Sequence, residues 1–178
     1  ERTSRPGIRA VSQQGCSQDG ALNLVMPRIR VAGSEDQSRW DDFILSQEQS
    51  GPYHLFAWKL AIERSYHHET RYLVSENDQG SILGVLPLVL IKPPLLSGTL
   101  VSLPFCDYGG VICPEREVSG QILEHASALA KSLNVALEVR CREPVPDVSH
   151  VCGPGMSTHK VRMLLDLPGN PELLWNGF

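Results

Sequence analysis

The sequence predicts an α/β domain whose sheet is mostly antiparallel and is flanked by helices. Short apolar segments typical of strands follow one another between residues 72 and 113, separated only by polar or proline-containing turns. Two helical patterns precede this region and one long helical pattern follows it. A doubly wound parallel sheet would instead alternate strand and helix along the whole chain. The order of elements therefore favours an antiparallel meander packed against helices.

The bulk composition fits one globular domain. The chain has 178 residues, of which 42% are hydrophobic, and a formal net charge of −4, so a core of domain size is expected. No long run of one charge occurs, and we expect no DNA partner. The longest apolar run, Ile82–Ile91, is far shorter than the roughly 20 residues that cross a bilayer. We therefore expect no membrane span.

Cysteine usage indicates a reducing compartment. The number of cysteines is odd and none forms a C-x-x-C pair, which argues against a zinc site and against a disulfide framework. We expect a cytoplasmic protein without a metal centre, in which the central three cysteines act as small apolar residues. The five cysteines are Cys16, Cys106, Cys113, Cys141 and Cys152.

The first part of the chain predicts a leader, a strand and two helices. Residues 1–25 are polar and lack a period, so we expect a disordered leader, and Arg28–Ala32 alternates like a short strand. Ser34 and Gln37 have the spacing of a capping box, which predicts a helix start. The apolar face of this helix is Trp40, Phe43 and Ile44, and Gly51-Pro52 ends it. A second helix, His54 to Tyr66, is expected to gather Leu55, Trp58, Ile62 and Tyr66 on one side.

The middle of the chain predicts the sheet. Tyr72–Ser75 is a short strand and Asn77–Gly80 a polar turn. Ile82–Ile91 is apolar enough for a strand buried on both faces, although Pro87 requires a bulge or an edge within it. Two further strand pieces, Thr99–Leu103 and Gly110–Cys113, are expected around a turn at Asp107–Gly110.

The last part predicts a long helix, two strands and the start of another helix. Pro114 and the acidic residues after it suit a helix start, and Asn134 suits its C-terminal cap. The buried face of this helix is expected to be Val118, Ile122, Ala126, Leu129 and Leu133. The later segments are a strand at Val135–Cys141, a loop at 143–155, a strand at Val161–Leu167 and a helix that begins at Pro171.

Two segments carry a resemblance to a known family. They are Gly51-Pro-Tyr-His-Leu-Phe-Ala-Trp58 and, more specifically, Leu103-Pro-Phe-Cys-Asp-Tyr-Gly-Gly110, with support from Gly84–Leu88, Met163–Leu167 and Leu174–Phe178. Residues 28–178 together resemble the FemAB-like N-acyltransferases of the GNAT superfamily, especially the branch beside exopolysaccharide and PEP-CTERM systems. The resemblance implies a GNAT-like domain at 26–168, the first of two in tandem. Residues 169–178 would then begin a helix that leads to the second domain.

The resemblance also implies a reaction. It is the transfer of an acyl or aminoacyl group to an amine of a cell-wall (peptidoglycan) or exopolysaccharide precursor. The donor would be acyl-CoA or aminoacyl-tRNA, no cofactor would be tightly bound, and the second GNAT-type domain would act in cis, so that this chain alone is inactive. The usual acyl-CoA signature, Gln/Arg-x-x-Gly-x-Gly/Ala before a helix, is absent. The alternative is a non-catalytic half-domain that binds a substrate or a partner.

Asp107 and Tyr108 are the first site candidates. A carboxylate and a phenol beside two glycines can hold an acceptor amine or a sugar hydroxyl, and an Asp can act as a general base. The structural alternative is that Asp107 only caps a turn. Gly109 and Gly110 are expected to permit positive φ or a close backbone approach.

Tyr53, His54 and Trp58 are the second set. A His at a helix start can bind substrate or move a proton, although a capping role is the simpler interpretation, and Trp58 suits the core as well as it suits ligand stacking. His67-His68-Glu69 has no partner cluster at metal-ligand spacing. We interpret it as a solvated helix end.

Overall fold

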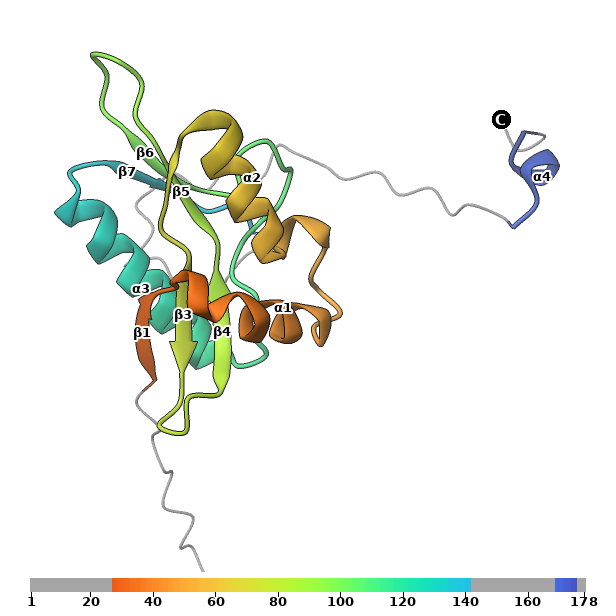
Figure 1. Ribbon diagram of the computed structural model, residues 1–178, viewed down its shortest axis with the longest axis horizontal. Helices are drawn as coiled ribbons and strands as arrows, with labels where there is room; N and C mark the ends of the chain where they lie inside the picture. Colours follow the sequence, from red (N-terminus) through yellow and green to blue (C-terminus); the bar gives the residue numbers. More distant parts are fainter. Residues whose placement is uncertain (1–26, 142–168, 176–178) are drawn as a thin grey trace, which may run out of the picture.

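A computed structural model describes residues 27–141 and 169–175, and it contains two sheets with helices on both sides (Figure 1). The first sheet has the order β1-β3-β4 and is antiparallel throughout. The second has the order β2-β5-β6-β7, in which only β6 and β7 are parallel. The predicted α/β class with a mostly antiparallel, mixed sheet is confirmed. The strands are β1 Arg28–Val31, β2 Glu69–Thr70, β3 Leu73–Glu76, β4 Ile82–Leu86, β5 Leu88–Ile91, β6 Thr99–Ser102 and β7 Ala136–Glu138.

Pro87 divides the long apolar run between the two sheets. Leu86, the last residue of β4, pairs with Leu73 of β3, whereas Leu88, the first residue of β5, pairs with Ser102 of β6. Proline has no N–H to donate to a ladder, so pairing is interrupted where it stands. The predicted single strand Ile82–Ile91, with a bulge or an edge at Pro87, is thus two strands, and Pro87 is the point at which the chain passes from one sheet to the other.

The helices cover opposite faces of the sheets. In Figure 1, α1 and α2 lie on one side and α3 on the other. Neighbouring residues of β3 show the same division, because Val74 packs with α1 and α2 and Leu73 packs with α3. The helical elements are η1 Ser34–Asp36, α1 Gln37–Leu45, η2 Pro52–His54, α2 Phe56–Tyr66, α3 Arg116–Ser132 and α4 Pro171–Trp175.

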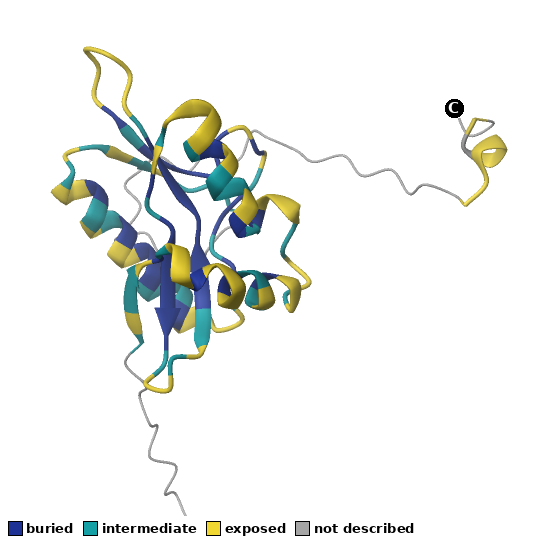
Figure 2. Cartoon of the chain, viewed as in Figure 1, coloured by how far each residue is buried: buried dark blue, intermediate teal, exposed yellow. Residues whose placement is uncertain are grey.

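Both faces bury a hydrophobic core, and β3 is buried along its whole length (Figure 2). On one face, Trp40 of α1 and Phe56 of α2 surround Tyr72, with ring centroids 5.2 and 6.2 Å from that ring. On the other face, Val118, Ile122 and Ala126 of α3 are buried as predicted, whereas Leu129 and Leu133 are only partly buried. The left-handed conformation of Asn134, at φ 54°, also fits the helix end predicted there.

Three local predictions are wrong. Ser34 makes no capping hydrogen bond; instead the Gly33 N–H donates to the Asp36 carboxylate at 2.8 Å, because that carboxylate is already held beside it. Helix α2 begins at Phe56, whose N–H donates to Asp41 Oδ1 at 2.7 Å. Tyr66 at its end is exposed. The predicted loop at 143–155 and strand at 161–167 lie outside the described residues.

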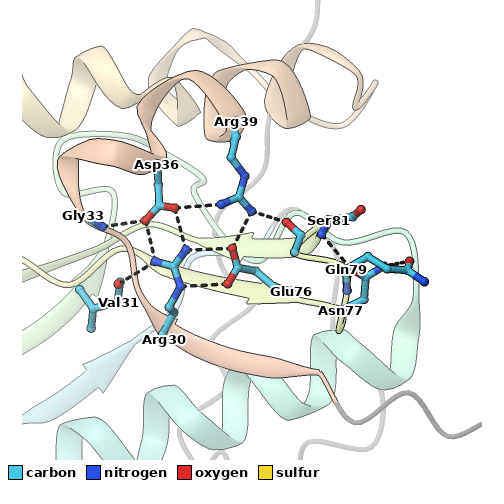
Figure 3. A network of polar contacts seen from close by, with 10 residues as sticks. Arg30, Val31, Gly33, Asp36, Arg39, Glu76, Asn77, Gln79 and Ser81 are labelled. Carbon is cyan, nitrogen blue, oxygen red and sulfur yellow. Dashed lines mark hydrogen bonds and ion pairs between the residues drawn. The ribbon is translucent and has the colours of Figure 1, made fainter.

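An ionic network fixes η1 and α1 to the first sheet (Figure 3). Arg30 of β1 contacts both Asp36 of η1 and Glu76 of β3, at 2.6 and 2.8 Å. Arg39 of α1 contacts the same two carboxylates and also the Gly80 carbonyl. Asp36 and Glu76 are buried, so two arginines offset the cost of placing two carboxylates in the fold.

Candidate functional site

The segment between β6 and α3 carries the more specific of the two family-like motifs. Its turn lies at Leu103–Cys106, where the Cys106 N–H donates to the Leu103 carbonyl at 3.2 Å. The predicted turn at 107–110 is wrong. Residues 108–110 form no hydrogen-bonded turn; the Gly109 N–H donates to the Arg140 carbonyl at 2.9 Å, and Ile112 forms an antiparallel bridge with Val85.

Gly109 and Gly110 serve close packing rather than unusual backbone angles. Neither has a positive φ, and both are buried. A Cβ on Gly109 would lie 2.6 Å from Cγ of Leu103, and a Cβ on Gly110 would lie 3.0 Å from Sγ of Cys141. Of the two roles expected for these glycines, the close approach is the one observed.

The segment between β6 and α3 brings Tyr108 to His54, the last residue of η2. The Tyr108 ring lies 6.2 Å from the His54 imidazole, centroid to centroid. A Cβ on Gly51 would contact both groups, at 3.6 Å from the Tyr108 hydroxyl and 3.9 Å from His54 Nδ1. The two family-like segments, which lie far apart in the sequence, therefore meet at His54 and Tyr108.

His54 is a buried, neutral hydrogen-bond donor. Its side chain is almost fully enclosed, and burial holds the pKa of the imidazole below its usual value. Nδ1 accepts the Gly51 N–H at 3.1 Å, so the neutral ring carries its proton on Nε2. Among the described residues, Nε2 has no hydrogen-bond partner. A buried donor without a partner is costly in a stable fold and is typical of a place where a ligand binds.

The backbone of η2 fixes the position of this imidazole. The Trp40 indole N–H donates to the His54 carbonyl at 2.7 Å, and the His54 N–H donates to the Gly51 carbonyl at 2.9 Å. Pro52 stands at the first position of η2, where its fixed φ suits a helical turn. The capping role proposed for His54 from the sequence is thus present, through Nδ1, and does not use the buried Nε2.

The other candidates lie around this pair without joining it. Asp107 is exposed. Tyr53 is half exposed and meets Trp58 edge to face, with centroids 4.9 Å apart. Trp58 is partly buried, and its indole Nε1 has no partner among the described residues. The structure therefore brings His54 and Tyr108 together and leaves Asp107 exposed.

Two features of the site region had no clear signal in the sequence. The Tyr72 hydroxyl is fully buried without a hydrogen-bond partner in the described part of the chain, and burial raises the pKa of this phenol. Phe105 is exposed and stacks on Tyr66. Both are aromatic residues, which sequence reasoning assigns to the core; only the tertiary structure shows that the Tyr72 hydroxyl is buried, with its ring against those of Trp40 and Phe56, and that Phe105 is exposed.

Residues 67–69 show no metal cluster. Within 27–141 and 169–175 no group of three or more His, Cys, Asp or Glu side chains is arranged to hold an ion. Over the same ranges no helix has the length and apolar character needed to cross a membrane.

Comparisons with known proteins identify the fold. No family model and no curated protein matches the chain. A crystal structure of a probable acetyltransferase superposes with a TM-score of 0.51 at 16% identity, over 80% of this chain and 99% of the other. A Trypanosoma brucei acetyltransferase gives 0.50 at 14% identity, over 79% and 99%. A mutant of the BH1408 protein from Bacillus halodurans gives 0.50 at 17% identity, over 79% and 99%. The chain has the GNAT fold predicted for it.

Proposed function

We propose that this chain is the acceptor-binding half of an N-acyltransferase of the FemAB type, which acylates or aminoacylates an amine on a cell-wall or exopolysaccharide precursor. The GNAT fold supports acyl transfer in general, and the two sequence motifs support the FemAB branch. The observation that carries the proposal is the meeting of these motifs at His54 and Tyr108, where a buried Nε2–H has no partner among the described residues.

The reaction requires little covalent chemistry from the protein. The acceptor nitrogen attacks the carbonyl carbon of the donor ester or thioester, a C–N bond forms, and the C–O or C–S bond breaks. The nitrogen gives up a proton and the leaving group takes one. Negative charge builds on the carbonyl oxygen in between, and a fixed donor in a buried site stabilises such charge. His54 Nε2–H is suited to that role or to holding the acceptor.

His54 is not suited to act as the general base. A base needs an unprotonated nitrogen facing the substrate, but Nδ1 already accepts the Gly51 N–H. Asp107, in the segment between β6 and α3, is exposed, so its carboxylate is accessible to a cationic amine. We give Asp107 the role of attracting the acceptor and Tyr108 that of orienting it.

The start of α3 argues against donor phosphates binding there. Glu115 is the N-cap of α3 and Glu117 lies in its first turn, so two carboxylates against one cation, Arg116, stand at the helix N-terminus, where anions would otherwise bind. Gly109 and Gly110 precede the Ile112 bridge and do not lead directly into the helix. We therefore propose that the donor, acyl-CoA or aminoacyl-tRNA, is bound mainly by a second GNAT-type domain in cis. The same observation favours an acceptor-binding role over catalysis by this domain alone.

The compartment follows from the same proposal. Cys106, Cys113 and Cys141 are free thiols, as expected where thiols stay reduced. We propose a cytoplasmic enzyme, in the compartment that supplies acyl-CoA and aminoacyl-tRNA.

A transfer assay tests this function. The full gene product is incubated with acetyl-CoA or with charged tRNA and a panel of amines, and amide products are identified by mass spectrometry. We expect an amide that forms together with release of free thiol or uncharged tRNA. Absence of an amide from every donor and amine pair contradicts the proposal.

A further inference from the structure

The turn between β5 and β6 exposes two adjacent leucines. Residues 92–97, Lys92-Pro-Pro-Leu-Leu-Ser97, are all exposed, and we call them the hairpin tip. Figure 1 shows the tip projecting beyond the sheets and helices, and Figure 2 shows it exposed throughout. Leu95 is fully exposed and Leu96 is 72% exposed. Apolar side chains gathered on a projection indicate contact with another molecule.

The backbone holds both leucines away from the domain. The Leu96 N–H donates to the Pro93 carbonyl at 3.4 Å, which closes the turn, and Pro93 and Pro94 each fix one φ angle. Leu95 has a φ of 66°, in the left-handed region that leucine disfavours. Neither leucine belongs to a hydrophobic core cluster of the described residues. Their replacement should therefore leave the fold intact.

The charges at the base of the hairpin tip are positive. Residues 81–106 contain one charged side chain, Lys92. The end of α3 lies beside the same base, because the Ala136 N–H donates to the Gly98 carbonyl at 3.1 Å, and Lys131 stands in the last turn of that helix. Both lysines are exposed, and neither has an ion-pair partner in the part of the chain that the structure describes. Free lysines beside an apolar projection suit an anionic surface.

The carboxylates on the two neighbouring strands do not offset these lysines. Glu69 on β2 is paired with Arg71, and Glu138 on β7 is paired with Arg140. Each of these carboxylates is thus already balanced by an arginine. The surroundings of the hairpin tip on its own sheet therefore favour an anionic partner over a cationic one.

The size and backbone of the hairpin tip favour lipid over protein. A standard protein interface uses about 20–30 residues on each side, whereas the tip offers six residues on one turn. Lipid has no water to satisfy backbone N–H groups. Pro93 and Pro94 have no N–H, and that of Leu96 is already bonded to a carbonyl. Half of the six positions therefore present no free donor to a bilayer.

We propose that the hairpin tip inserts Leu95 and Leu96 into the surface of a bilayer containing anionic phospholipid, while Lys92 and Lys131 contact lipid phosphates. A single apolar anchor holds a protein only marginally at a bilayer, and basic side chains supply the second attraction. The attachment is reversible and needs no membrane-spanning segment. It goes beyond the proposed function, because it involves neither an acyl donor nor an acceptor.

Vesicle cosedimentation tests the inference. The full chain is mixed with vesicles of phosphatidylglycerol and phosphatidylcholine in equal parts, or of phosphatidylcholine alone. We expect binding to the first and at least about fivefold weaker binding to the second, the contribution of one lysine. Leu95→Ser combined with Leu96→Ser should weaken binding by about tenfold or more, the loss expected from one buried leucine. Leu45→Ser, at the exposed end of α1, is the matched control and should bind like the wild type.

A reporter in the hairpin tip separates insertion from simple adsorption. The indole introduced by Leu95→Trp should shift its fluorescence to shorter wavelength when anionic vesicles are added, and brominated lipid should quench it. Melting temperatures of all variants should match the wild type, because neither leucine packs in the core.

Four results would overturn the inference. They are no binding of the wild type to anionic vesicles, equal binding by the double serine variant, an indole that vesicles leave unchanged, and a full gene product that does not bind although this chain does. The last result, or a dimer that the double serine variant loses, would show that protein covers the hairpin tip. Vesicle binding by a protein without transferase activity would leave the inference intact and count only against the proposed function.

Discussion

The guanidinium of Arg30 makes two hydrogen bonds to the carboxylate of Asp36, at 2.6 and 2.7 Å, and thereby joins β1 to η1. The Asp36 side chain is only 1% exposed, and Arg30 also holds Glu76. Removal of either partner of this pair should destabilise the fold, because the other charge would stay buried without compensation.

Replacing Arg30 by Met should lower the free energy of unfolding by about 3 kcal/mol, the cost of leaving a buried carboxylate short of its partner. Urea unfolding measures the change. The double variant Arg30→Met with Asp36→Asn should recover part of the loss, since it removes the buried charge as well. A single variant as stable as the wild type would show that the network contributes little.

The same network makes the fold sensitive to strong acid. Hydrogen bonds from Arg30 hold the pKa of Asp36 and of Glu76 below their usual values. Both groups therefore stabilise the folded chain above the unfolded pKa of about 4, and that contribution is lost as pH falls through the folded pKa values. Stability measured between pH 5 and pH 2 should fall less steeply in the variant Asp36→Asn than in the wild type.

His54 should produce a separate loss of stability at milder pH. Its pKa is lowered by burial, so the unfolded chain takes up a proton more readily than the folded chain. The unfolded imidazole titrates near pH 6.5, and stability should therefore decrease as pH falls from about 6.5 towards 5, by up to about 1.4 kcal/mol per pH unit. The urea midpoint should depend less on pH across this window in His54→Asn than in the wild type. An equal pH dependence in both proteins would contradict a neutral, buried His54.

Two glycines should respond in opposite directions to alanine. At Gly109 a Cβ would meet the Leu103 side chain, and overpacking of this kind costs about 1–3 kcal/mol. At Gly120, within α3, a Cβ would meet nothing within 4 Å, so Gly120→Ala should stabilise by roughly 0.5–1 kcal/mol. Thermal melts of both variants test this, and a harmless Gly109→Ala would show that the segment packs more loosely than described.

The buried faces of helices and strands were predictable from the sequence, whereas the exact positions of turns and helix ends were not. The break at Pro87 and the buried face of α3 follow from missing N–H groups and from apolar spacing. The turn at Leu103–Cys106 did not follow, because it depends on Gly109 packing under Leu103 and on Ile112 pairing with Val85. Such contacts are set by the tertiary structure.

The site was predictable as two motifs but not as one place. His54 and Tyr108 were each candidates within their own segments. No helical or strand periodicity relates positions 54 and 108, so the sequence does not indicate that the two side chains are in contact. Tyr66 had the spacing of a core residue, and only the structure places it under Phe105. The role of Asp107 remains a proposal, which Asp107→Asn tests: transfer by the full gene product should fall at least about tenfold, or 1.4 kcal/mol, with the melting temperature nearly unchanged.

The central claim is that His54 donates a hydrogen bond from Nε2 during acyl transfer. His54→Asn keeps an oxygen that can accept the Gly51 N–H, but its shorter amide places no N–H at the former Nε2 position, whereas His54→Gln can place an amide N–H there. The measurement is kcat/KM for amide formation by the full gene product, beside the melting temperature of each variant. We predict a loss of about tenfold or more in His54→Asn, about 1.4 kcal/mol, and a smaller loss in His54→Gln. Wild-type kcat/KM in a folded His54→Asn variant would contradict the account.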